Sequence, residues 1–146
     1  MIVLNKNQLR EITNFLEKRF GFKGELNYTF LREGKELFVT NKDVSKMHFK
    51  GLKVRKTGVY FGKVLDGDVL LSVEGSQIVG KSAKNNVIVL AAEEVYLWLS
   101  GAEIKSKVED GIYLVREDKD FLGCCKVRNN IIINSLSMDR RVKILV

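Results

Sequence analysis

The spacing of apolar residues near the start of the chain predicts a helix. Between Asn7 and Gly21 an apolar side chain recurs every three or four positions, which is the period of one helical face. Asn7 is expected to cap the start of this helix, and Gly21 is expected to end it. The apolar positions of this face are Leu9, Ile12, Phe15, Leu16 and Phe20.

Two pairs of segments with alternating apolar and polar residues predict β-hairpins. Glycine and the pair Asp-Gly favour the tight turns of such hairpins, because these residues adopt positive φ values at little cost. The first 80 residues are therefore expected to form a small subdomain of helix and strands. The paired segments are residues 28–32 and 36–40, around Glu33 and Gly34, and residues 59–65 and 69–73, around Asp66, Gly67 and Asp68.

A change of period after residue 86 predicts a strand followed by a short helix. Residues 87–90 are an unbroken apolar run rich in β-branched side chains, typical of a strand buried on both faces. Residues 91–100 then take the helical period, and Gly101 is placed to end the helix in the left-handed conformation. The expected buried face of this helix consists of Val95, Trp98 and Leu99.

Two further strands are expected beyond this helix. They cover residues 111–115 and 121–127, and the polar residues 117–120 are expected to form the turn between them. Cys124 and Cys125, the chain's two cysteines, are adjacent on the second strand, so their side chains are expected to lie on opposite faces. A disulfide between them would be strained, and we interpret both as buried thiols.

The order of these elements resembles the PUA domain. The resemblance rests on the helix that ends in Leu99 to Gly101, Leu-x-Gly, and on a later strand with hydrophobic-Leu-Gly at Phe121 to Gly123. This family of small β-barrels is appended to pseudouridine synthases, archaeosine transglycosylases, rRNA methyltransferases and a large-subunit ribosome-biogenesis factor. Upstream, YTFLREGKELFVTNKDVSK and GLKVRKTGVYFGKV are similar to the region before the PUA-like tail of Sun-type RNA cytosine methyltransferases and of that biogenesis factor.

The resemblance implies an α+β fold, with a small αβ N-terminal subdomain followed by a PUA-like β-barrel. The first part would be a pre-PUA αβ subdomain over residues 1–80, and residues 86–146 would form the PUA-like RNA-binding domain. The methyltransferases also carry a catalytic domain with a proline-cysteine motif. This chain contains no proline, so the resemblance implies an RNA-docking part without that catalytic machinery.

The charge pattern favours an anionic partner. The formal net charge is +7, and residues 50–63 carry several cations and no acid. Alternation over residues 52–55 predicts a strand that buries Leu52 and Val54 and presents Lys53 and Arg55 outwards. The expected RNA contacts are Lys53, Arg55, Lys56, Lys81, Lys84, Gly101, Ala102, Lys105, Lys107, Arg140, Arg141 and Lys143.

Part of this set follows from the resemblance. Gly101, Ala102 and Lys105 correspond to part of the family's RNA-facing edge, and the segment RRVKILV would be the final strand of the barrel. Two plainer explanations stay open at this point. Gly101 can be a simple helix cap, and a run of lysines can be a solvated face.

One motif favours a different function. Residues 75–82, GSQIVGKS, satisfy the pattern G-x-x-x-x-G-K-[ST] of the phosphate-binding loop of nucleotide-binding proteins. That loop requires a helix directly after the motif, and the β-branched run at residues 87–90 leaves no room for one. We therefore interpret Gly75 and Gly80 as loop glycines in a polar joint over residues 75–86, next to phosphate contacts at Lys81 and Lys84.

Other catalytic chemistry has little support in the sequence. His48 is the one histidine, flanked by Met47 and Phe49, and is expected to be packed rather than to act as a general base. One histidine and two adjacent cysteines do not make a metal site, and no cofactor is expected. Trp98 is expected in the core, because it lies on the apolar helical face; Tyr60 and Tyr113 are weaker candidates for base stacking.

These observations together predict an RNA-binding protein without enzymatic activity. It would recognise folded rRNA or tRNA by shape and phosphate contacts, as an accessory factor in RNA modification or ribosome biogenesis. Its protein partner would be an RNA methyltransferase or a ribosome assembly factor. The alternatives are a protein–protein adaptor in ribosome assembly and, ranked lower, a nucleotide-binding protein. Neither a signal peptide nor a membrane span is expected, so a cytoplasmic location is predicted.

Overall fold

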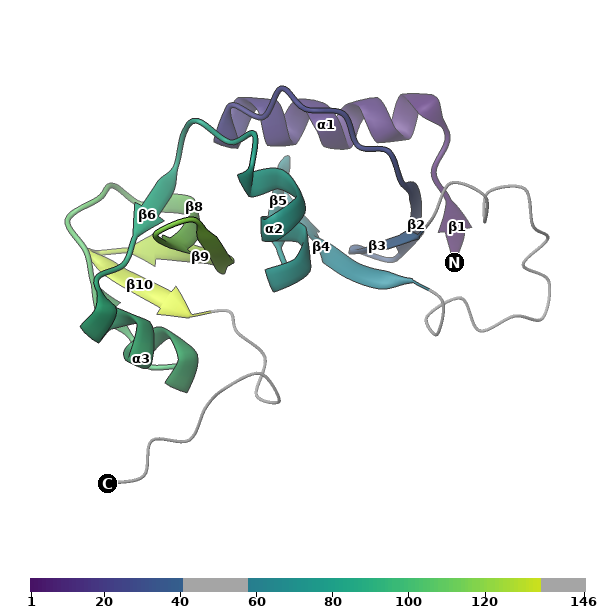
Figure 1. The fold of residues 1–146 in the computed structure, drawn as a ribbon. Coiled ribbons are helices and arrows are strands. Elements are labelled where there is room, and N and C mark those ends of the chain that lie inside the picture. Colours follow the sequence, from purple (N-terminus) through teal and green to yellow (C-terminus); the bar gives the residue numbers. More distant parts are fainter. Residues whose placement is uncertain (41–57, 135–146) are drawn as a thin grey trace.

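The computed structural model describes residues 1–40 and 58–134 and has an α+β architecture (Figure 1). Its N-terminal part consists of helix α1 (Lys6–Phe20) and a five-stranded antiparallel sheet. Its C-terminal part is a curled, mixed five-stranded sheet that forms a half-barrel. The expected α+β fold, with an αβ part followed by a barrel-like sheet, is confirmed.

Both sheets follow simple strand orders. The N-terminal sheet runs β1-β2-β3-β4-β5, and the half-barrel runs β6-β8-β9-β10-β7, with β6 parallel to β8 and all other pairs antiparallel. The strands of the first sheet are β1 (Ile2–Val3), β2 (Thr29–Glu33), β3 (Glu36–Thr40), β4 (Val59–Leu65) and β5 (Asp68–Leu71). Those of the half-barrel are β6 (Val87–Val89), β7 (Ile104–Lys105), β8 (Gly111–Glu117), β9 (Asp120–Arg128) and β10 (Ile131–Asn134). The remaining helices are α2 (Val73–Gly80) and α3 (Ala92–Ser100).

Helix α1 matches its predicted apolar face and its predicted end. The buried residues of that face lie against the N-terminal sheet, and Gly21 ends the helix in the left-handed conformation. The predicted cap Asn7 is wrong. The structure places the cap at Asn5, whose Oδ1 accepts from the Gln8 N–H at 2.9 Å while Gln8 Oε1 accepts from the Asn5 N–H. This reciprocal pair satisfies donors at the helix start, and Asn7 lies inside α1 as its second residue.

The predicted hairpins are present, with one error at the end of the second. Asp66 and Gly67 have φ values of 43° and 81°, as expected for a two-residue turn between β4 and β5. The second strand was expected to reach Val73, but β5 ends at Leu71. Ser72 instead caps α2, because its Oγ accepts from the Gly75 N–H at 2.9 Å, and Val73 becomes the first helical residue.

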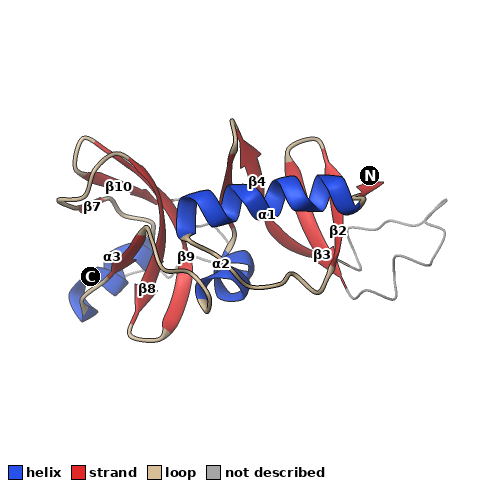
Figure 2. Ribbon diagram, turned by 90° about the horizontal axis from the view of Figure 1, so that it is seen from above, coloured by secondary structure: helices blue, strands red, loops and turns tan. Residues whose placement is uncertain are grey.

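Helix α2 corrects the interpretation of residues 75–86 as a polar joint. Gly75 and Gly80 are helical residues of α2, not loop glycines. A Cβ at Gly75 would collide with the Phe61 carbonyl oxygen of β4, and a Cβ at Gly80 would lie 2.5 Å from the Phe121 ring of β9. The two glycines therefore let α2 pack closely between the N-terminal sheet and the half-barrel (Figure 1 and Figure 2).

The half-barrel contains the predicted strand, helix and hairpin, but β6 is less buried than expected. Ile88 and Leu90 are buried, whereas Val89 is 55% exposed. The expectation of burial on both faces is therefore wrong. Ile88 packs in the cluster around Trp98, and Val87, on the other face, packs against the cluster that includes Phe61. That second face is therefore covered at Val87 and exposed at Val89.

Strand β9 lies between two apolar clusters. Cys124 belongs to the cluster that includes Ile12 and Phe61, and Cys125 belongs to the cluster around Trp98. Both cysteines are buried and form no disulfide, and they lie on opposite faces as predicted. Burial raises the pKa of Cys124 from 9.0 to about 12, and it also raises the pKa of Cys125.

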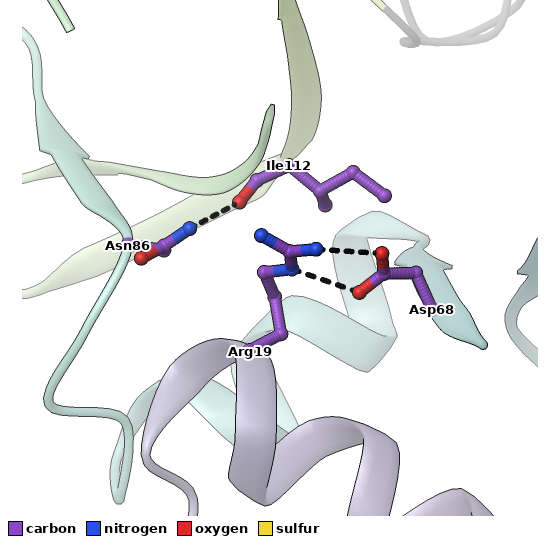
Figure 3. Close-up of polar contacts among 4 residues, drawn as sticks. All are labelled: Arg19, Asp68, Asn86 and Ile112. Carbon is purple, nitrogen blue, oxygen red and sulfur yellow. Dashed lines mark hydrogen bonds and ion pairs between the residues drawn. The ribbon is translucent and has the colours of Figure 1, made fainter. Parts of the chain in front are cut away.

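Two sets of polar contacts lie near the junction, one within each part (Figure 3). The Arg19 guanidinium at the end of α1 donates from Nε and Nη2 to the two carboxylate oxygens of Asp68, both at 2.8 Å. Beside this pair, Asn86 Nδ2 donates to the Ile112 carbonyl oxygen at 3.0 Å. The Asn86 carbonyl accepts from the Leu114 N–H at 2.8 Å, so the connection into β6 is anchored on β8.

Within residues 1–40 and 58–134, no helix has both the length and the apolar character needed to cross a membrane.

Replacing Gly75 by alanine is expected to lower the free energy of unfolding by about 1–3 kcal/mol. The added Cβ would collide with the Phe61 carbonyl, although alanine is otherwise the better helix former. Denaturant unfolding measures the difference. Gln77→Ala, on the exposed side of the same helix, is the matched control and should stay within about 0.5 kcal/mol of the wild type. Equal stability of the wild type and Gly75→Ala would show that α2 does not pack this closely.

The buried thiol of Cys124 predicts a loss of stability in alkali. Its pKa is raised in the folded state, so above pH 9.0 the unfolded state loses the proton first and is favoured as the pH rises towards about 12. Cys124→Ala removes this dependence. The difference in free energy of unfolding between the wild type and Cys124→Ala should therefore shrink by about 1.4 kcal/mol per pH unit above that point. A difference that stays constant with pH would contradict the burial of this thiol.

Candidate nucleic-acid interface

The structure describes half of the predicted RNA contacts. Lys81, Lys84, Gly101, Ala102, Lys105 and Lys107 lie in the described part of the chain. The predicted strand over residues 52–55, His48 and the predicted final strand lie outside the described residues. So do the predicted contacts Lys53, Arg55, Lys56, Arg140, Arg141 and Lys143.

Gly101 turns the chain from α3 into the segment that carries Lys105 and Lys107. Its φ of 83° is left-handed, as predicted, and its N–H donates to the carbonyl of Trp98 at 3.1 Å. The Ala102 N–H donates to the Leu97 carbonyl at 2.9 Å. These contacts satisfy the last carbonyls of α3, so Gly101 acts as the cap of this helix. The contact of Gly101 with RNA stays a prediction.

Pairing with β10 holds the lysine segment in place. Ile104 lies opposite Ile132 and Lys105 lies opposite Ile131, at one edge of the half-barrel (Figure 2). Ile104 is buried, and Lys105 is exposed. The Ser106 N–H donates to the Asn130 carbonyl at 2.8 Å, which extends the contact beyond β7 and leaves Lys107 exposed.

A hollow of about 690 Å³ lies between this segment and the β9–β10 turn. Its lining has two ammonium groups, a hydroxyl and two amides, and it has no carboxylate. Such groups are hydrogen-bond donors suited to a phosphate. Asp110 lies at the same turn, where its Oδ1 accepts from the Asn129 N–H at 2.9 Å. We call this the lysine hollow, and it is lined by Lys105, Ser106, Lys107, Asn129, Asn130 and Ile131.

Sequence reasoning found the lysines of this hollow and missed its asparagines. Asn129 and Asn130 have φ values of 50° and 63° and form the two-residue turn between β9 and β10. The signal was present in the sequence, because Asn-Asn between two apolar segments favours a hairpin turn with positive φ values. What the sequence did not show is that this turn lies beside Lys105.

Lys81 and Lys84 lie away from the lysine hollow. The N–H groups of Lys84 and Asn85 donate to the Phe20 carbonyl at 2.8 and 3.0 Å, so this stretch satisfies the end of α1. Lys84 is exposed there, and Lys81 lines a different hollow that also contains carboxylates. The structure therefore divides the described contacts into two places instead of uniting them.

Trp98, Tyr60 and Tyr113, the residues considered for base stacking, lie outside the lining of the lysine hollow. Trp98 is 1% exposed and its Nε1 donates to the Leu122 carbonyl at 3.1 Å, which confirms its place in the core. The Tyr113 hydroxyl donates to the Glu109 carbonyl at 2.8 Å, and burial raises the pKa of this phenol. Tyr60 packs against Phe38, with ring centroids 5.5 Å apart.

The segment that matches the phosphate-binding motif has a geometry unlike a phosphate-binding loop. Its amides are bonded within and around α2: the Ser76 N–H donates to the Ser72 carbonyl, and the Ser82 N–H donates to the Val79 carbonyl. These donors are therefore not free to surround a phosphate. Among the described residues, no group of three or more acidic, histidine or cysteine side chains could hold a metal ion.

Neither ATP nor GTP is expected to bind at Lys81 in the presence of magnesium, because the motif's amides are already paired. Isothermal titration calorimetry of the wild type and of Lys81→Ala measures this directly. Neither protein should show a heat of nucleotide binding. Magnesium-dependent binding that Lys81→Ala abolishes would overturn this prediction and favour a nucleotide site.

Comparison with known proteins does not assign the chain to a family. No family model matches the sequence, and no curated protein matches it. The resemblance to the PUA domain therefore rests on the short motifs around Gly101 and Gly123.

Proposed function

We propose that this protein binds folded RNA and that the lysine hollow receives a backbone phosphate. The observation that carries the proposal is the pairing of β7 with β10, which places Lys105 and Lys107 against the Asn129–Asn130 turn. Lysines neutralise phosphates, and side-chain amides and hydroxyls fix the position of the backbone on the protein.

The charge of the whole chain supports the same partner. A net charge of +7 attracts polyanions at a distance, while the acid-free hollow supplies a local point of contact. In double-stranded RNA the base edges lie in a narrow, deep major groove, so contact with phosphates and 2′-hydroxyls is the expected mode of recognition. Shape rather than base sequence would then select the RNA.

The proposed biological role follows from the sequence resemblance. The RNA would be rRNA or tRNA, and the protein would act in the cytoplasm as an accessory factor in RNA modification or ribosome biogenesis. An RNA methyltransferase or a ribosome assembly factor would be its protein partner. RNA recovered by crosslinking and sequenced would identify which of these RNAs it meets.

Replacing both Lys105 and Lys107 by alanine is expected to weaken RNA binding and to reduce its dependence on salt. If about five phosphates are contacted, log affinity should fall against log salt with a slope of about −3.5 on single-stranded RNA. The double variant should reduce the magnitude of this slope by about 0.7, because the one phosphate contact of the lysine hollow is removed. Fluorescence anisotropy over a salt series measures both quantities.

The matched control replaces Lys6 and Lys18, two exposed lysines of α1, and so removes the same charge elsewhere. It should change the slope less than the Lys105 and Lys107 variant does. The proposal fails if both double variants have the same slope, if the wild-type slope is flat, or if heparin binds as tightly as RNA.

A further inference from the structure

A second hollow, of about 920 Å³, lies where the N-terminal part meets the half-barrel. Three segments form its walls: the connection from α1 to β2, one side of α2, and the turn between β8 and β9. We call it the junction cleft. Its volume is in the range of pockets that hold small ligands or a few side chains, about 300–1,000 Å³.

One face of α2 lines the junction cleft. Gln77, Ile78 and Lys81 follow Glu74 at three, four and seven positions, which places all four on the same helical face. The opposite face of α2 is buried and carries Gly75 and Gly80, so a closely packed helix supports this wall. The apolar part of the lining consists of Tyr28, Ile78, Phe121 and Leu122, each partly exposed.

The charges of the junction cleft differ from those of the rest of the protein. The chain has a net charge of +7, yet the cleft has three carboxylates against two lysines. Glu25 and Asp120 lie on different walls and are both exposed. Within the described part of the chain the ion pair present is that of Arg19 with Asp68, so neither carboxylate is paired with Lys81 or Lys119. The lining thus has a formal charge of −1 (two lysines minus three carboxylates), which favours a cationic group over an RNA phosphate.

We propose that the junction cleft docks a basic peptide segment of a protein partner. An apolar side chain of that segment packs on Ile78 and Phe121, and arginines beside it pair with Glu25 and Asp120. Arginine suits this place because its planar guanidinium bonds a carboxylate through two donors and packs on aromatic rings. The cleft is distinct from the lysine hollow, so the partner and an RNA would bind at separate surfaces.

The probe for this proposal is the peptide acetyl-Arg-Leu-Arg-amide, titrated into the full-length ¹⁵N-labelled chain. Two peptides are its controls: acetyl-Glu-Leu-Glu-amide reverses the charges, and acetyl-Arg-Ser-Arg-amide removes the apolar anchor. Amide resonances of Gln77, Ile78, Phe121 and Leu122 should shift with the first peptide, with a dissociation constant of about 1 mM. Both control peptides should bind at least about tenfold more weakly.

The matched variants are Glu25→Lys in the cleft and Glu17→Lys on the exposed side of α1, which make the same change in charge. Glu25→Lys should weaken binding of the first peptide about tenfold, and Glu17→Lys should leave it within about twofold of the wild type. Glu25→Lys should bind RNA no more weakly than the wild type does, because it adds positive charge. The Lys105 and Lys107 variant should bind the first peptide with the wild-type affinity. Failure of one proposal is therefore distinguishable from failure of the other.

Four results would overturn the docking proposal. The first is the absence of shifts in the cleft, and the second is equal binding of the acidic peptide. The third is an RNA oligonucleotide that shifts the same cleft amides as the peptide does. The fourth is self-association of the chain that Glu25→Lys abolishes, because a second copy would then be the occupant.

Discussion

The close approach of α2 to both sheets is the constraint on which the rest of the structure depends. Gly75 faces the carbonyl oxygen of Phe61, and Gly80 faces the ring of Phe121, with no space for a methyl group at either position. Because the helix touches both sheets, a single apolar cluster continues from α1 through the N-terminal sheet to β8 and β9. The half-barrel is thus held by packing as well as by the chain connection. The ion pair of Arg19 with Asp68 joins α1 to β5 within the N-terminal part.

The two candidate binding surfaces depend on different parts of this framework. The lysine hollow needs only the pairing of β7 with β10, which is internal to the half-barrel. The junction cleft needs both parts at once, because its walls come from α2, from the connection before β2 and from the β8–β9 turn. A change that loosened the junction would therefore alter the cleft and leave the lysine hollow intact.

Elements set by local pattern were predictable from the sequence, and contacts between distant segments were not. Periodicity and turn residues were sufficient for α1, α3 and the hairpin turn at Asp66 and Gly67, because those signals act within a few positions. Helix α2 was missed because its glycines and its match to a nucleotide motif concealed the cap at Ser72. The exposure of Val89 was missed because the segments that cover each face of a strand come from far along the chain. For the same reason charge indicated Lys105 and Lys107, whereas their asparagine neighbours emerged only from the fold.

Strand β9 is a wall shared by two apolar interiors, and its alternation divides its side chains between them. Cys124 contributes to one interior and Cys125 to the other, so a slip of one residue in the pairing of β9 would exchange their contents. The irregularity at Val115 and Arg116 and the two-residue turn at Asn129 and Asn130 oppose such a slip on either side of the strand. One register of β9 therefore decides which side chains enter each of the two apolar clusters. This shared strand couples the folding of the N-terminal part to that of the half-barrel.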